Sequence, residues 1–243
     1  MKNKGNYVYK REIKMKKIGL IGGMSWESSA LYYQRINQLV HEALGGLNSA
    51  KIIFYSVNFK EIEQLQRNEE WERAGNKLAV IAKKLEDAGC DAVALCTNTM
   101  HKVAPQILSA INIPFLHIID AVAAEIQQLK LKKVVLLGTK FTMGQAFYIT
   151  QLINFGIDVV VPHLDDQLII NRIIYDELCQ GIINSQSKEI YKTIIQKQIV
   201  SGAEGVILGC TELGLIVDQA DFNIAVLDTT EIHVRKIVDF ILQ

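Results

Sequence analysis

The chain has 243 residues, 49% of them hydrophobic, and its 26 basic and 26 acidic residues leave no formal net charge at neutral pH. A chain of this length can bury a large core, as one domain or as two halves. Because the charges balance, no net field draws the protein to nucleic acid or to an anionic membrane surface. We expect a small-molecule partner, with no nucleic acid and no membrane.

The cysteines show no CxxC spacing, which argues against a zinc site and for a reducing compartment. No apolar run approaches the roughly 18 residues of a membrane span, and the N-terminus lacks the apolar stretch of a signal peptide. We therefore expect a cytoplasmic protein with free thiols and no metal. Residues 1–14 form a basic N-terminal extension without a pattern, to which we assign no function. The four cysteines are Cys90, Cys96, Cys179 and Cys210.

Short β-rich runs alternate with stretches of helical period along the chain, as in parallel sheets built from βα units. In the first half, strands are predicted at residues 17–22, 51–57, 91–96 and 114–118. Helices are predicted at residues 25–44 and 70–88 and around Pro105, and Gly89 ends the second of them. In the second half, strands are predicted at residues 133–137, 157–161, 205–208 and 224–227, and a last helix at residues 231–242.

The two halves repeat one another in order and at a nearly constant offset. KKIGLIGG at Lys16 matches KKVVLLGT at Lys132, AGCDAVALCTNT at Ala88 matches SGAEGVILGCTE at Ser201, and NIPFLHIID matches NIAVLDTTE. We predict an α/β protein of two pseudo-symmetric Rossmann-like domains, each with a central parallel four-stranded sheet flanked by helices. The domains are predicted at residues 15–118 and 119–228, with the C-terminal helix, 229–243, packing back on the first.

Small polar residues follow the third predicted strand of each half. The repeat pairs Thr97 with Cys210, Asn98 with Thr211 and Thr99 with Glu212. In open parallel sheets ligands bind beyond the carboxyl ends of the strands, so Thr97 and Cys210 are predicted on opposed walls of one site. Two proton-carrying groups on opposite sides suit removal of a proton from a tetrahedral carbon and delivery of another to the opposite face. This is racemisation without a cofactor.

The motifs IGLIGGMSWES, LCTNTMHK and LGCTE, in this order, resemble those of the aspartate/glutamate racemase family over residues 15–243. The resemblance implies a cofactor-independent (PLP-independent) amino-acid racemase of two α/β domains, and a homodimer. The family usually carries one catalytic cysteine in each half. Anchoring on Asn98 and Thr99 puts Thr97 in place of the first cysteine and Cys210 in place of the second, as in a subgroup with one threonine. Cys96 lies one position before the place of the family's first catalytic cysteine.

The chemistry of the two catalytic candidates differs. A thiol has a reference pKa near 8.5, and helix N-terminal N–H groups can lower it, so Cys210 is expected to supply a thiolate. A hydroxyl is a far weaker acid, so Thr97 is expected to be a proton donor or relay, and unequal one-way rates for the two enantiomers follow. The alternative is that Cys96 is the acid/base group of the first half through a one-residue shift.

Binding groups follow from what the carbanion needs. Asn98, Thr99 and Thr211, with backbone amides at two helix starts, are expected to hold the α-carboxylate and stabilise the enediolate. Glu212 is expected to take the α-ammonium, and Met24 to lie at the mouth of the site. Gln66 and Thr139 complete the predicted substrate-binding set. GLIGGM lacks the GxGxxG spacing of a dinucleotide loop.

The resemblance is less complete at the residues that select the substrate side chain. Strict aspartate racemases of the family use an Arg after the second strand and a Lys in the second half for the distal carboxylate. Here Gln66 and Leu168 stand at these places. Either Arg67 or Arg172 reaches in, or the pocket accepts neutral side chains such as that of homoserine. We favour a broad-specificity racemase over a strict aspartate one.

Two other classes stay open. A cofactor-free decarboxylase or maleate-type isomerase of the same superfamily would use the same geometry on a substrate without an α-amino group. A two-lobed small-molecule binding protein would leave Cys210 a buried bystander. Cys90 and Cys179 are read as structural. His101 either orients a site group or has a surface or capping role.

Overall fold

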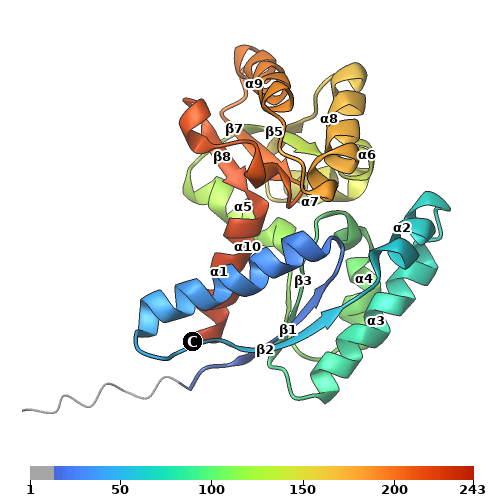
Figure 1. Ribbon diagram of the computed structural model, residues 1–243, viewed down its shortest axis with the longest axis vertical. Helices are drawn as coiled ribbons and strands as arrows, with labels where there is room; N and C mark the ends of the chain where they lie inside the picture. Colours follow the sequence, from blue (N-terminus) through green and yellow to red (C-terminus); the bar gives the residue numbers. More distant parts are fainter. Residues whose placement is uncertain (1–13) are drawn as a thin grey trace, which may run out of the picture.

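Each half of the chain forms a four-stranded parallel sheet with helices packed around it, in a computed structural model that describes residues 14–243 (Figure 1). The strand order is β2-β1-β3-β4 in the first sheet and β6-β5-β7-β8 in the second, with every neighbouring pair parallel. The two orders are equivalent, because in each the first strand of the half lies between the second and the third. The predicted α/β fold with two similar halves is therefore confirmed.

The first domain contains all the strands predicted for it. Its elements are β1 (Lys17–Gly22), α1 (Trp26–Leu44), β2 (Lys51–Ser56), α2 (Phe59–Arg67), α3 (Trp71–Asp87), β3 (Ala92–Leu95), the 3-10 helix η1 (Thr99–Val103), α4 (Ala104–Ala110) and β4 (Phe115–Leu116). Strand β4 is shorter than predicted because it pairs with β3 alone and because His117 already caps the next helix. Helix α2 was not predicted, although Asn58 caps it and its apolar positions have helical spacing.

The second domain follows the same plan. Its elements are α5 (Ile118–Gln128), β5 (Lys133–Gly138), α6 (Lys140–Gly144), α7 (Ala146–Asn154), β6 (Asp158–Val160), α8 (Leu164–Asp176), η2 (Leu178–Gln180), α9 (Ser185–Val200), β7 (Gly205–Gly209), η3 (Leu213–Leu215), η4 (Gln219–Asp221), β8 (Ala225–Asp228) and the last helix, α10 (Thr229–Ile241). The central strands β5 and β7 are almost entirely buried, which fits their continuous apolar sequence. Of the predicted N-terminal extension, residues 1–13 lie outside the described residues.

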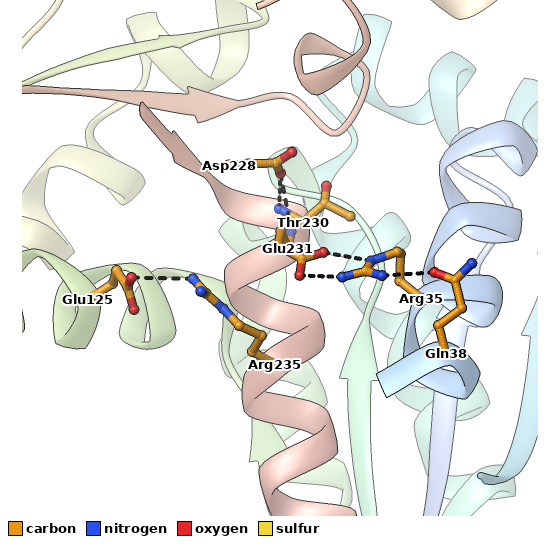
Figure 2. A network of polar contacts seen from close by, with 7 residues as sticks. All are labelled: Arg35, Gln38, Glu125, Asp228, Thr230, Glu231 and Arg235. Carbon is orange, nitrogen blue, oxygen red and sulfur yellow. Dashed lines mark hydrogen bonds and ion pairs between the residues drawn. The ribbon is translucent and has the colours of Figure 1, made fainter. Parts of the chain in front are cut away.

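Helix α10 runs from the end of the second sheet to the first domain and lies beside α1 (Figure 1). Asp228 caps it, its Oδ1 accepting from the backbone N–H groups of Thr230 and Glu231. Figure 2 shows how its two faces are held. Glu231 accepts two bonds from Arg35 of α1, at 2.7 and 3.0 Å, and Arg235 pairs with Glu125 of α5 at 3.3 Å. Helix α10 therefore connects the two domains through polar contacts on both sides.

The apolar face of α10 supplies Val234, Ile237 and Ile241 to the same buried cluster as strand β1 and helix α1. Separate clusters fill the other faces of the two sheets. Among the described helices, none combines the length and the apolar character that crossing a membrane requires. Within residues 14–243, no group of His, Cys, Asp and Glu side chains could hold a metal ion.

Candidate active site

A small cavity lies between the two domains, at the carboxyl ends of the central strands. All nine residues predicted for the site line it, and they come from both halves of the chain: Met24, Gln66, Thr97, Asn98, Thr99, Thr139, Cys210, Thr211 and Glu212. Its volume is about 30 Å³, enough for one or two water molecules. The sheet topology explains the convergence, because the turns after β3 and β7 occupy equivalent places in their sheets.

The turn after β1 brings the first domain against the second. Gly23 has a φ of 91°, and a Cβ there would lie 2.3 Å from the carbonyl oxygen of Val57, so this turn requires glycine. Its N–H donates to Ser29 Oγ at 2.7 Å. Ser25 then caps α1, and its Oγ donates to Glu212 Oε1 of the other domain at 2.6 Å. The turn thus places Met24 in the cavity wall and ties Ser25 to the opposite wall.

Thr97 is held through its backbone. Its carbonyl oxygen accepts from His101 Nδ1 at 2.7 Å, while His101 Nε2 accepts from the N–H of Ile118 at 3.2 Å. These partners define a neutral imidazole with its proton on Nδ1. Burial, with His117 and His233 next to it, lowers the pKa of His101 well below its ordinary value. Of the two roles considered for His101, the structure favours orientation of a site residue.

Hydroxyl and amide groups continue this wall. Thr99 Oγ1 lies 3.2 Å from Thr139 Oγ1 and 3.3 Å from Thr142 Oγ1, so these hydroxyls bridge the two domains. Asn98 Nδ2 donates to Thr229 Oγ1, whose own proton goes to the carbonyl oxygen of Leu208. The hydroxyl of Thr229 has already donated its proton, so it can only accept a further hydrogen bond. The side-chain amide of Asn98 is therefore oriented with its nitrogen, not its oxygen, toward Thr229.

The opposite wall carries the thiol and a carboxylate. Cys210 Sγ and Thr211 Oγ1 both donate to Glu212 Oε2, each at 2.9 Å. Burial, followed by the charge of Glu212, raises the pKa of the Cys210 thiol well above its ordinary value. The backbone N–H of Glu212 does lower the pKa of the thiol, but burial and the charge of the carboxylate outweigh it, so the predicted net lowering is wrong. The elements after β3 and β7 are the short 3-10 helices η1 and η3, so the two expected α-helix starts are absent from these turns, and a carboxylate adjoins the sulfur.

The other cysteines divide between core and cavity. Cys96 is fully buried in the apolar cluster of β1, α1 and α10, outside the cavity lining, and burial raises the pKa of its thiol. The structure therefore favours Thr97 over Cys96. Cys90 packs in the first domain. Cys179, interpreted from the sequence as structural, lines the cavity instead, and burial raises the pKa of its thiol to about 12.

The part of the cavity wall built by described residues contains no Lys, Arg or His. Gln66 Nε2 donates to Met100 Sδ. Arg67 is exposed and pairs with Glu63 on its own helix, Leu168 is 59% exposed, and Arg172 lies on the surface. Neither Arg67 nor Arg172 lines the cavity in this structure, and both residues are exposed. A more open hollow lies next to the cavity. Arg67 and Lys140 line this hollow, and it shares the lining residues Gln66 and Tyr175 with the cavity.

Several cavity residues were not predicted. Ser25, which contacts the lining residue Glu212 without lining the cavity itself, lies inside a quoted motif, but its bond to Glu212 could not be known from that motif. Helix α8 supplies Ile174 and Tyr175, which lie outside the quoted motifs. The remaining unpredicted lining residues are Phe59, Cys179 and Gly209.

Comparison with known proteins matches this arrangement to one family. The sequence profile described as Asp/Glu/Hydantoin racemase matches residues 21–237. The broad specificity amino-acid racemase RacX of Bacillus subtilis (strain 168) is 28% identical over 221 residues, covering 88% of this chain and 92% of that protein.

Solved structures agree in fold along the chain. A candidate Asp/Glu racemase from Yersinia pestis is 50% identical, with a TM-score of 0.89 over 94% of this chain and 100% of the other. An aspartate racemase homologue from Pyrococcus horikoshii OT3 is 42% identical, with a TM-score of 0.83 and the same coverage. The Picrophilus torridus aspartate racemase, 22% identical, shares the fold with a TM-score of 0.73, over 94% of this chain and 96% of that one.

Proposed function

The chain belongs to the Asp/Glu/Hydantoin racemase family, and from this premise we propose that it is a cofactor-independent amino-acid racemase in which Thr97 and Cys210 act on opposite faces of Cα. One observation carries the proposal. Thr97 and Cys210 follow the equivalent strands β3 and β7, and both line one interdomain cavity. A substrate held between them has a proton-carrying group on each side.

The reaction needs stabilisation of the carbanion as well as proton transfer. When the α-proton leaves, charge moves onto the α-carboxylate, and donors aimed at that carboxylate lower the barrier. The hydroxyls of Thr99, Thr139 and Thr211 are positioned along the cavity for this purpose. Glu212 is the acidic residue of the lining and provides an acceptor for the α-ammonium.

The substrate side chain is expected to be neutral. A distal carboxylate buried without a cation would lose its hydration without compensation, and the described lining has no cation. The similarity to a racemase named as broad in specificity supports the same conclusion. We therefore favour small neutral or polar amino acids, such as serine and homoserine, over aspartate.

Substrate binding requires the two domains to separate. The cavity of about 30 Å³ is smaller than an amino acid. The side-chain contacts that cross it or its rim include Ser25 to Glu212, Thr99 to Thr139 and Thr142, and the edge-to-face pair of Trp71 and Phe141 with ring centroids 5.4 Å apart. These few contacts are modest individually, so opening is compatible with catalysis.

The experiment is NMR detection of α-proton exchange in deuterium oxide across alanine, serine, homoserine, aspartate and glutamate. We expect exchange with formation of the opposite enantiomer, fastest for neutral side chains. Thr97→Val and Cys210→Ala should each lower the rate about 100-fold or more, and Cys96→Ala, a change in the core, should retain it. Absence of exchange with every amino acid would favour the binding-protein or the decarboxylase alternative.

A further inference from the structure

Glu212 accepts three hydrogen bonds inside the site. Ser25 Oγ donates to Oε1 at 2.6 Å, and Cys210 Sγ and Thr211 Oγ1 donate to Oε2 at 2.9 Å each. The Glu212 residue is only 4% exposed. Serine, threonine and cysteine each have a single proton to give, and all three give it to this carboxyl group. An acceptor of three such donors is an ionised carboxylate, and the cysteine beside it is a thiol.

A thiol cannot remove an α-proton until its own proton has gone elsewhere. The titratable groups packed around Cys210 are Tyr175 of α8, Cys179 of η2, Tyr191 of α9 and Glu212 of the turn after β7. Burial raises the pKa of both tyrosines and of Cys179, so these three hold their protons at neutral pH. Among the described residues, Glu212 is therefore the proton acceptor in contact with the sulfur.

We propose that Glu212 is a catalytic base of this site, which takes the Sγ proton of Cys210 while Cys210 takes the α-proton of the substrate. This inference rests on the proposed racemase function. It changes the role of Cys210 from a resting thiolate to a thiol that is activated only during reaction.

The Sγ–H bond breaks and an O–H bond forms on Glu212 Oε2. The electron pair left on sulfur forms a new Sγ–H bond with the α-hydrogen, and the Cα–H pair moves into the enediolate of the substrate. Thr97 Oγ1 gives its proton to the other face and takes one from water. The hydroxide so formed is neutralised by the proton on Glu212, which restores the starting state.

The geometry also assigns a positioning role to Ser25. Ser25 belongs to the turn after β1 and is the one described residue of the first domain that donates to this carboxylate. Its bond fixes Oε1 and so aims Oε2 at Cys210. Because that bond crosses between the domains, the base is oriented only when they are closed.

The decisive test compares two pH profiles in Glu212→Gln, which keeps the shape of the side chain and removes its basicity. The first is the kcat for α-proton exchange in deuterium oxide. The second is the rate at which iodoacetamide alkylates Cys210 in the absence of substrate, resolved from the other cysteines by mass spectrometry. In the wild type we expect exchange at neutral pH together with slow alkylation.

In Glu212→Gln we expect kcat at neutral pH to fall about 100-fold, the usual contribution of a general base. It should then recover about tenfold per pH unit, as base titration of the thiol replaces the lost carboxylate. The midpoint of that recovery should coincide with the alkylation midpoint of Cys210. That midpoint should lie below the wild-type one, because a neighbouring negative charge has been removed.

Two further variants complete the design. Glu212→Asp keeps a base at a longer distance, so it should lose rate and keep the wild-type shape of the profile. Glu177→Gln replaces a carboxylate that accepts from Ser187 in the same domain, outside the cavity lining, and should leave both profiles unchanged. Circular dichroism establishes that each variant is folded.

The outcomes separate this inference from the proposed function. A Glu212→Gln profile that is lowered equally at every pH, or that keeps the wild-type rate at neutral pH, contradicts the base role and leaves the racemase standing. A rise in KM with kcat unchanged contradicts it too, because it assigns Glu212 to ammonium binding alone. Wild-type protein without exchange overturns the racemase, while the alkylation midpoints still report whether the thiol and carboxylate are paired.

Discussion

The two walls of the cavity have the same place in the fold and different acid–base chemistry. The turn after β3 presents Thr97 among neutral groups, with the imidazole of His101 behind it. The turn after β7 presents Cys210 against the carboxylate of Glu212. The repeat of the backbone therefore sets where the two groups lie. The neighbours of each group decide how readily it gives up or takes a proton.

Cys210→Ser makes both walls alcohols and is expected to have the largest effect. Neither wall then has a group that ionises within reach of Glu212, so α-proton exchange should fall about 1000-fold, within the range of general acid–base contributions. The measurement is α-proton exchange in deuterium oxide. If the exchange rate of Cys210→Ser stayed within tenfold of the wild-type rate, catalysis would not depend on having a thiol on one wall and a hydroxyl on the other.

The histidines behind the Thr97 wall predict a loss of stability in mild acid. Burial lowers the pKa of His101 and of His117, and it lowers that of His233 to about 4. The folded state keeps these rings neutral, whereas the unfolded chain takes up protons below about pH 6.5. The free energy of unfolding therefore decreases as the pH falls from about 6.5 toward 4, by on the order of 3 kcal/mol for His233 alone.

Urea unfolding at pH 7 and pH 5 measures this loss. His233 donates to the carbonyl oxygen of Leu116 and lies 2.9 Å from the hydroxyl of Tyr32. His163 is an exposed control, with 80% of its side chain accessible, so His163→Gln should keep the wild-type dependence on pH. Equal stability at the two pH values would contradict the buried neutral arrangement.

Gln66→Arg tests whether the absence of a cation sets the substrate. An Arg at this position would bring a guanidinium into the cavity wall, where it can pair with a distal carboxylate. We expect kcat/KM for aspartate to rise about tenfold relative to serine, which corresponds to about 1.4 kcal/mol. Gln64→Arg, on the exposed face of the same helix, is the matched control. An unchanged ratio would place side-chain recognition elsewhere.

Thr97→Cys is expected to have the smallest effect, because it makes both walls thiols. The equilibrium between enantiomers fixes the ratio of the two kcat/KM values near one, so a kinetic bias appears in kcat and KM together. We expect the two kcat values to approach one another by a factor of a few. Initial rates from each enantiomer, followed by polarimetry, measure it. A larger separation than in the wild type would contradict the idea that the threonine causes the bias.

Much of the fold was predictable because it depends on short-range patterns. Apolar runs marked the strands, and the match between KKIGLIGG and KKVVLLGT showed that two halves share one topology. The repeat then places the residues after β3 and β7 at equivalent positions of the two sheets, so the cavity residues of these two turns could be predicted, whereas Met24 and Gln66 came from the family resemblance. Helix α2 was missed because its first turn has no run of apolar residues, although its cap was readable at Asn58.

The sequence by itself determined the α/β architecture of two similar halves and predicted that the residues after their third strands meet in one cavity, because these follow from periodicity and from the repeat. Only the tertiary structure decided the state of the groups there. It placed Glu212 beside Cys210, which raises the pKa of the thiol, and it left Arg67 on the surface. It also joined Ser25 to Glu212 across the domains. Acid strength depends on burial and on charges a few ångströms away, and such neighbours come from distant parts of the chain.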